Sequence, residues 1–226
     1  MHNDDIRQLL VHCTDQIEGV EESISDGELN RILLKNTLEN LRSVLDYLAQ
    51  DIVIKLKTKP KNGNLSEKVY FPYGQRENHF NNSVKRNLPP LKEDEPKIYD
   101  LLESIQPFKS KDNWVVDLCS LTNDAKHNSL SKTESQENTV VEQKGFARIE
   151  GGRNVMMVGN YFNGVRQDDV FIDGDGNANV VRHSGTTLVT TNTRIKFHGK
   201  ELEIVPFLNH CHKQITELSR NAGSLL

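Results

Sequence analysis

The segment LLKNTLENLRSVLDYLAQDI, residues 33–52, decides the fold of this chain. Its apolar residues alternate steps of four and three, which places them on one face of an α-helix. These residues are Leu34, Leu38, Leu41, Leu45, Leu48 and Ile52. We expect a long amphipathic helix that forms the centre of a helical bundle. A two-stranded coiled coil is the alternative, because a heptad stripe can also pair with a second copy.

Similar apolar spacing recurs on both sides of this helix. It runs over residues 4–24, 98–105, 114–125 and 206–218. Ser25 and Glu28 have the Ser-x-x-Glu spacing of a capping box, in which each side chain satisfies a free backbone amide. The central helix is therefore expected to begin there. Together, these segments predict an antiparallel bundle formed by residues 1–130 and 205–226.

Residues 58–90 interrupt the helical pattern. This stretch is rich in Lys, Asn, Gly and Pro, residue types that favour turns. A connection of this length is unusual inside a compact domain unless side chains tie it down. We expect a partly ordered crossover that is anchored on the bundle by Phe71, Tyr73 and Phe80.

A different pattern appears in residues 146–204. Runs such as FARIEGGRNVMMVGNYFNGV and DVFIDGDGNANVVRHS alternate short β-branched or aromatic stretches with Gly, Asn and Asp turns. They predict four to six antiparallel strands. Residues 131–145 are polar and are expected to be a flexible connection. The predicted fold class is α+β, an antiparallel helical bundle with an inserted small antiparallel β module.

Composition limits the classes of function. The 226 residues carry a formal net charge of -4, which removes the overall positive field of a dedicated nucleic-acid binder. No apolar run approaches the length of a membrane span, and the start of the chain lacks the pattern of a signal peptide. We expect no contact with a membrane and a cytoplasmic location. Cys13, Cys119 and Cys211 lie at apolar helical positions and are expected to be buried free thiols.

One turn superficially matches a calcium-binding loop. Asp173, Asp175 and Asn177 have the spacing of the first EF-hand ligands. However, Ala178 stands where that loop needs glycine, and Ser184 stands where it needs a bidentate glutamate. An Asp- and Gly-rich β-turn accounts for these residues.

Two other segments also fail as ligand sites. His210, Cys211 and His212 are adjacent on a predicted helix, so their side chains diverge by about 100° per residue and cannot converge on one ion. The glycine-containing segment GGRNVMMVGN lacks the lysine and hydroxyl residue of a phosphate-binding loop. The sequence therefore predicts no metal and no cofactor.

The segment LTNDAKHNSL, residues 121–130, is the best candidate for chemistry. Asn123 and His127 are four residues apart and share one face of a helix, with Asp124 and Lys126 beside them. This set can bind a phosphate or act as an acid and a base. The alternative interpretation is a hydrogen-bonded helix end, where a histidine interacts favourably with the helix dipole.

Three segments also carry a family resemblance. They are LENLRSVLDYLAQ at 38–50, VYFPYGQRENHF at 69–80, and IYDLLESIQPFK with LCSLTNDAKHNSL in 98–130. In their order and spacing they resemble a bacterial helical-bundle family related to the HEPN superfamily (higher eukaryotes and prokaryotes nucleotide-binding). The resemblance covers about residues 30–130 and does not reach the β-rich segment.

The resemblance implies a dimeric bundle in a bacterial defence or stress system. Active HEPN ribonucleases carry an arginine, a polar residue and then a histidine, and dimerisation brings two such motifs together on RNA. Here Asn123 and His127 match, but Thr122 stands where the arginine would be. Without that guanidinium a fixed cation for the phosphate charge is missing.

We therefore expect a non-catalytic binding protein that engages RNA or a protein partner, most simply as a homodimer. Two alternatives remain open. One is a metal-independent ribonuclease that uses His127 with Asp124 or Lys126, and the other is a structural protein of a homo-oligomeric assembly. In the β-rich segment we expect the binding residues to be Arg153, Tyr161, Arg166 and Arg182, because Arg and Tyr are enriched at interface hot spots.

Overall fold

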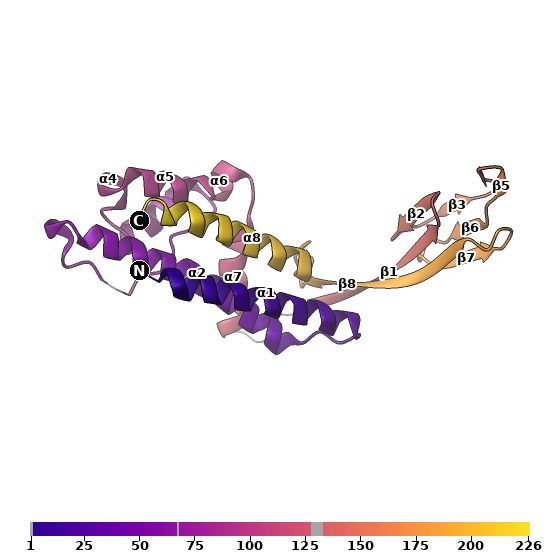
Figure 1. Cartoon of the computed structure of the whole chain (residues 1–226), viewed down its shortest axis with the longest axis horizontal. Helices are drawn as coiled ribbons and strands as arrows, with labels where there is room; N and C mark the ends of the chain where they lie inside the picture. Colours follow the sequence, from indigo (N-terminus) through magenta and orange to yellow (C-terminus); the bar gives the residue numbers. More distant parts are fainter. Residues whose placement is uncertain (1, 67, 128–132) are drawn as a thin grey trace. The chain divides into compact units, whose positions relative to one another are not determined.

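The computed structural model of the protein describes residues 2–66, 68–127 and 133–226, without the side chains of residues 3, 124–127, 136 and 193. The chain divides into two compact units. The helical unit comprises Met1–Lys132 and Phe197–Leu226, and the β unit comprises Thr133–Lys196. The fold is α+β, with small antiparallel sheets inserted between two helices of the bundle (Figure 1).

The helical unit contains four long helices. They are α1 (Asn3–Ser25), α2 (Arg31–Lys57), α7 (Trp114–His127) and α8 (Ile204–Gly223). The short elements between α2 and α7 are η1 (Pro60–Asn62), α3 (Glu77–Asn87), α4 (Leu91–Asp94), α5 (Pro96–Ser104) and α6 (Pro107–Ser110). Helix α2 packs against α1, α7 and α8, and it is the central helix of the unit (Figure 1). None of the described helices is both long and apolar enough to cross a bilayer.

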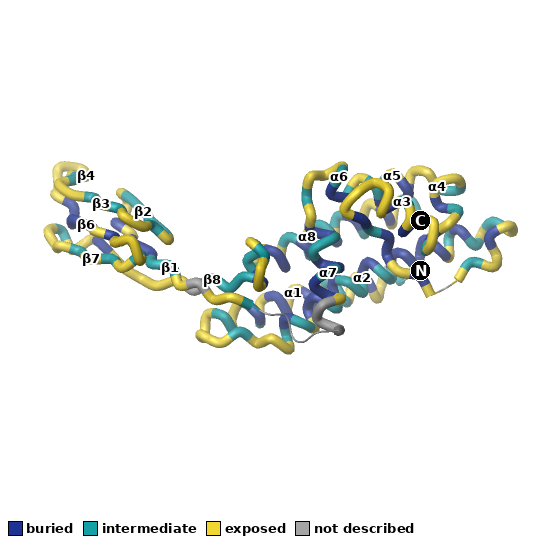
Figure 2. The backbone as a smooth tube through the Cα atoms, turned by 180° about the vertical axis from the view of Figure 1, so that it is seen from behind, coloured by how far each residue is buried: buried dark blue, intermediate teal, exposed yellow. Residues whose placement is uncertain are grey.

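The apolar stripe of α2 is buried along its whole length. Leu34, Leu38, Leu41 and Leu45 are 0% exposed, and Leu48 and Ile52 are at most 2% exposed. Because α1, α7 and α8 of the same chain cover this stripe, it forms a bundle core within one molecule, as predicted. Cys13, Cys119 and Cys211 are free and buried, as expected. Figure 2 shows buried residues along the facing sides of these helices.

The predicted start of α2 is wrong by several residues. Ser25 is the last residue of α1, and its hydroxyl donates to the carbonyl of Glu21 in the same helix. Gly27 then adopts a left-handed φ of 92°, which ends the helix. Asn30 caps α2 instead, because its backbone is extended and its side-chain oxygen accepts a hydrogen bond from the amide of Leu33 at 3.0 Å.

The stretch predicted to be a crossover contains an eleven-residue helix, α3. Phe71 and Phe80 are buried anchors, as expected, whereas Tyr73 is only partly buried. Gly74 allows the chain to pass close to α3, since a Cβ at this position would lie 2.3 Å from the amide nitrogen of Phe80. The amide of Gly74 also donates to the side chain of Gln106 at 3.0 Å.

The β unit has eight short or medium strands among its described residues. They are β1 (Thr133–Gln143), β2 (Ala147–Glu150), β3 (Val155–Met157), β4 (Tyr161–Phe162), β5 (Val165–Arg166), β6 (Asp169–Ile172), β7 (Ala178–Val181) and β8 (Thr187–Phe197). They form three sheets, in the orders β2-β1-β8, β3-β6-β7 and β4-β5. The number of strands therefore exceeds the four to six that the sequence predicted.

The interpretation of residues 131–145 as a flexible connection is corrected by β1. This strand spans residues 133–143 and pairs with β2 in antiparallel register, with Val140 opposite Glu150. Its polar composition suggested flexibility, but β1 lies between β8 and β2 in the sheet, and β2 pairs with its last four residues. Val141 is buried in the core of the unit together with Val170 and Ile172, and Val140 is buried as well.

Candidate functional site

The predicted motif lies on the C-terminal half of α7. Thr122 is buried, and its hydroxyl donates to the carbonyl of Leu118 one turn earlier. An arginine at this position would therefore point into the protein. Asn123 is exposed, and its amide group donates to the hydroxyl of Tyr73 at 3.4 Å. The side chains of Asp124, Lys126 and His127 lie outside the described residues.

A cationic side chain from α2 lies close to this motif. The guanidinium carbon of Arg42 is 5.1 Å from the centre of the Tyr73 ring, the same tyrosine that contacts Asn123. Arg42 also pairs with Asp46 at 3.4 Å and contacts the sulfur of Cys119. Burial raises the pKa of the Cys119 thiol to about 12, so this sulfur stays a neutral thiol. Arg42 is 77 residues from Cys119 in sequence, and no local pattern indicates that they meet.

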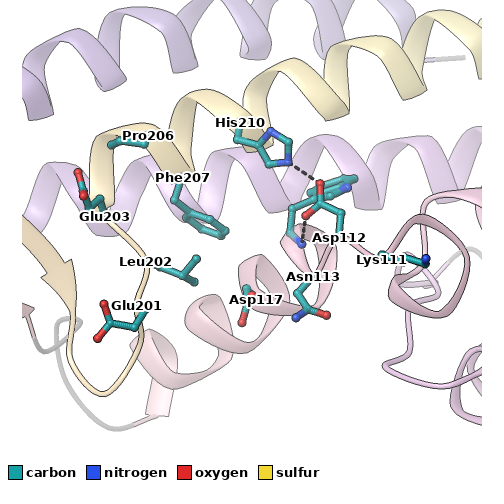
Figure 3. Close-up of a pocket in the computed structure, with 11 residues that line it drawn as sticks. Lys111, Asp112, Asn113, Asp117, Glu201, Leu202, Glu203, Pro206, Phe207 and His210 are labelled. Carbon is teal, nitrogen blue, oxygen red and sulfur yellow. Dashed lines mark hydrogen bonds and ion pairs between the residues drawn. The ribbon is translucent and has the colours of Figure 1, made fainter.

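A pocket of about 600 Å³ lies between the N-terminal ends of α7 and α8 (Figure 3). Trp114 and Phe207 give it an apolar floor, and carboxylates surround the floor. The described lining residues are Lys111, Asp112, Asn113, Trp114, Asp117, Glu201, Leu202, Glu203, Pro206, Phe207 and His210. Lys111 is unusual because it has a left-handed φ of 61°, a conformation that costs a non-glycine residue about 1–2 kcal/mol.

Two pairs of polar side chains lie close together at the pocket. The Nε2 atom of His210 lies 2.6 Å from a carboxylate oxygen of Asp112, and Figure 3 shows the ring pointing at that group. The other oxygen of Asp112 accepts a hydrogen bond from the amide of Trp114 and so caps α7. Asp117 pairs with Lys200. No hydroxyl or thiol lines the described pocket, although its carboxylates and Lys111 belong to residue classes that can act as nucleophiles.

In the β unit, a buried carboxylate organises the loop after β7. The side chain of Asp168 accepts hydrogen bonds from the amides of His183, Ser184, Gly185 and Thr187 at 2.6–3.1 Å. Burial alone would raise the pKa of Asp168, but these backbone hydrogen bonds outweigh burial and hold the pKa well below its usual range. Asp168 therefore stays ionised and fixes residues 183–187.

The neighbouring carboxylate, Asp169, joins three further groups. It accepts a hydrogen bond from the amide of Gly159 at 2.8 Å, and it lies 2.9 Å from Nε2 of His183 and 3.2 Å from Arg166. The Gly159 amide and the His183 ring hold the pKa of Asp169 below its usual range. The sequence gives no signal for this cluster beyond two adjacent aspartates, because the partners of Asp169 are 3–14 residues away across turns.

The four binding residues predicted in the β-rich segment differ from one another in what their side chains contact. Arg166 pairs with Asp169, Arg182 contacts the carbonyl of Thr187 and lies 3.6 Å from Asp168, and Arg153 donates to the carbonyl of Gly174 at 3.2 Å. These arginines thus brace turns of the β unit. Tyr161 differs because 65% of its surface is exposed, and it stands opposite Arg166 on the β4-β5 hairpin.

The turn that superficially matched an EF-hand loop is a hydrogen-bonded turn. One carboxylate oxygen of Asp173 accepts the amides of Asp175 and Asn177, both at 2.9 Å, as in an Asx-turn. No three His, Cys, Asp or Glu side chains among the described residues come together as a metal site. His210 and His212 point to different partners, Asp112 and the carbonyl of Leu10.

Comparison with known proteins assigns no relative to this chain. No family, no curated protein and no solved structure matches it.

Proposed function

We propose that this protein is a non-catalytic binding protein that associates with a second copy of itself through the β unit. The observation that carries this proposal is the distribution of exposed apolar side chains. Fourteen large hydrophobic residues are exposed among the described residues, and ten of them belong to the β unit. Those ten are Phe146, Met156, Val158, Tyr161, Phe162, Val165, Phe171, Val181, Leu188 and Val189. Figure 2 shows the β unit as mostly exposed or intermediate.

The register of the β3-β6-β7 sheet places part of this set on one face. Side chains alternate between the faces of a sheet. Val155, Met157, Val170 and Ile172 belong to the buried core side. Met156 and Phe171, which are directly opposite each other, therefore lie on the outer face, together with Val181 on β7. We call Met156, Phe171 and Val181 the outer face.

A sheet with apolar residues on both faces is typical of a sheet that is covered on both sides. The core side of this sheet is covered by Val141 and Ile149, whereas Met156 on the outer face is 71% exposed. Contiguous exposed apolar surface marks interaction sites, and Met156 and Phe171 are direct neighbours on this face. The exposed outer face therefore supports the proposal that a protein partner binds there.

Charge does not oppose a second copy as that partner. Acidic and basic residues nearly balance over residues 133–196. The register places Asp169 on the same side as Phe171, and this carboxylate is already bonded to Arg166 and His183. Two copies of the outer face can thus approach each other without like-charge repulsion. A nucleic acid finds no excess of positive charge in this unit.

Sedimentation-velocity ultracentrifugation of the full chain tests the proposal. We expect a concentration-dependent dimer that Met156→Asp weakens by about 30-fold or more, since a buried charge replaces a central apolar contact. Val11→Asp is the matched control, because Val11 on α1 is 61% exposed and lies in the helical unit. A wild-type monomer at all concentrations, or equal effects of both substitutions, would contradict the proposal.

RNA binding at the C-terminal half of α7 is a second candidate function. The observation that favours it is the contact chain of exposed Asn123, aromatic Tyr73 and cationic Arg42, which combines the group types that bind single-stranded RNA. Because Thr122 is buried in place of the motif arginine, binding without cleavage is expected. Gel-shift and cleavage assays on single-stranded RNA test this. Salt-sensitive binding lost in Arg42→Ala supports it, and cleavage abolished by His127→Ala contradicts the non-catalytic part.

A further inference from the structure

The β4-β5 hairpin is the most exposed part of the β unit. All four of its strand residues, Tyr161, Phe162, Val165 and Arg166, are exposed. Asn163 and Gly164 connect the strands with φ values of 50° and 77°, the signature of a tight type I′ turn. The hairpin forms a two-stranded sheet of its own, so its backbone is not paired with another strand of the described residues.

The hairpin is nevertheless held in place. The Phe162 ring packs against Phe146, with 5.8 Å between the ring centres. At the base of the hairpin, the amide of Gln167 donates to the carbonyl of Asn160 at 2.8 Å, and its side chain donates to the carbonyl of Val165 at 2.9 Å. A hairpin that is braced before binding loses less conformational entropy when it binds.

The same unit contains a pocket that the hairpin of its own copy does not fill. This pocket has a volume of about 470 Å³ and lies over β3, β6 and β7. Its described lining includes Met156 and Phe171 of the outer face, and it also includes Asn179 and the turn residue Asp173. No residue of the hairpin lines it.

Hairpin and pocket are complementary in chemistry. The hairpin presents an exposed aromatic ring, Tyr161, whose strand partner Arg166 is paired with Asp169 of the same copy but keeps 46% of its side chain exposed. The pocket offers apolar walls and, at its edge, the carboxylate of Asp173, whose pKa is lowered by hydrogen bonds from Asn177. Tyr and Arg are the side chains most enriched among interface hot spots, and hot spots fill pockets at the partner surface.

We infer that the β4-β5 hairpin of one copy inserts Tyr161 into the pocket formed by Met156 and Phe171 of a second copy. This inference rests on the proposed self-association and names the residues that make it. We take the exchange as reciprocal, because each copy carries both a hairpin and a pocket. Reciprocal contacts give a twofold dimer with two equal contacts, whereas one-way contacts would give an open chain of copies.

Reciprocity allows a mixing experiment on the full chain. Tyr161→Asp removes the inserted residue, and Met156→Asp spoils the pocket. Both side chains are mostly exposed, so both variants are expected to fold. Each variant alone lacks both contacts and should dimerise at least about 30-fold more weakly than the wild type in sedimentation velocity. An equimolar mixture keeps one intact contact in each heterodimer and should recover a measurable part of the association.

The outcomes separate this inference from the function on which it rests. A wild-type monomer overturns both. A wild-type dimer that Tyr161→Asp leaves unchanged overturns only the hairpin insertion, as does a mixture no more associated than its two components. Leu188→Asp is the control, since Leu188 is 60% exposed in the β unit but belongs to neither the hairpin nor the pocket. It should leave the dimer intact.

Discussion

The helical unit and the β unit place their apolar residues in opposite ways. In the helical unit, the long helices turn their apolar stripes towards one another, and the stripe of α2 is at most 2% exposed. In the β unit, the fully buried apolar residues are Val140, Val141, Val170 and Ile172, while ten large hydrophobic residues are exposed. The helical unit buries its apolar stripes within itself, whereas the β unit leaves apolar surface exposed.

The difference extends to what stabilises each unit. A small apolar core contributes little stability to a unit of this size. The β unit adds a buried polar network, in which Asp168 accepts amides from one loop and Asp169 joins β6 to Gly159 and His183. The helical unit is thus stabilised mainly by packing, and the β unit depends strongly on hydrogen bonds to carboxylates. The predictions below test this contrast.

The largest effect is expected in the helical core. Leu45→Ala should lower the free energy of unfolding by about 2–5 kcal/mol, because it leaves a cavity at a fully buried position. Trp114 is the only tryptophan and is buried in the helical unit, so its fluorescence in a urea titration reports on that unit. Ile32→Ala, at an exposed position on α2, should change the stability by no more than about 0.5 kcal/mol. Equal midpoints for the two variants would refute the packing assignment.

The second largest loss of stability is expected in the β unit. Asp168→Asn should destabilise that unit by about 2–3 kcal/mol, because the amide group that replaces one oxygen faces donors and leaves them unsatisfied. Hydrogen–deuterium exchange read by mass spectrometry should show faster exchange in residues 183–187, with unchanged exchange in α2. Asp175→Asn, at an exposed turn position, is the control. Unchanged protection of residues 183–187 would show that the carboxylate is dispensable.

Lowering the pH should test the role of Asp168 in a second way, because it protonates this carboxylate. The pKa of Asp168 is lower in the folded state than its unfolded value of about 3.9. Its stabilisation is therefore fully present above that unfolded value and is lost as the pH falls towards the folded pKa. Amide NMR signals of the wild-type β unit should weaken on acidification below about pH 4, and Asp168→Asn should flatten this dependence. If the wild type and Asp168→Asn lost these signals over the same pH range, the lowered pKa of Asp168 would be contradicted.

The smallest effect is expected at the hairpin turn. Gly164→Ala should cost about 1–2 kcal/mol, because an alanine is strained at a φ of 77° although it meets no neighbouring atom. Gly63→Ala is the matched control in the helical unit. Its φ of -54° suits alanine, and the substitution should be neutral or stabilising by up to about 1 kcal/mol. Local hydrogen exchange at the two sites measures both effects, and similar values would argue against a type I′ turn.

A structural feature could be predicted from the sequence when the residues that form it are close together in the sequence. The stripe from Leu34 to Ile52 is a local pattern, so it predicted α2 and its burial correctly. The start of α2 was wrong because Asn30 competes with Ser25 as a cap, and the left-handed Gly27 decides between them. Strand β1 was missed because its composition is polar and because one of its two partner strands, β8, is distant in sequence.

The candidate sites depend even more on distant contacts. The pair of Asp112 and His210 joins residues 98 positions apart, and the contact of Arg42 with Cys119 spans 77 positions. No local spacing encodes either. The sequence did single out Tyr161 by residue type, but the arginines chosen by the same argument brace turns. Residue type alone therefore did not separate the arginines, which bond to their own unit, from Tyr161, for which the interface role stays a prediction.

Hydrogen–deuterium exchange of the wild-type chain at increasing protein concentration tests the central claim most directly. If the β unit is the association surface, protection should rise with concentration in residues 155–172, which contain β3, the hairpin and β6, and stay constant in α1 and α2. Protection that is independent of concentration, or that rises in the helices instead, would contradict the account.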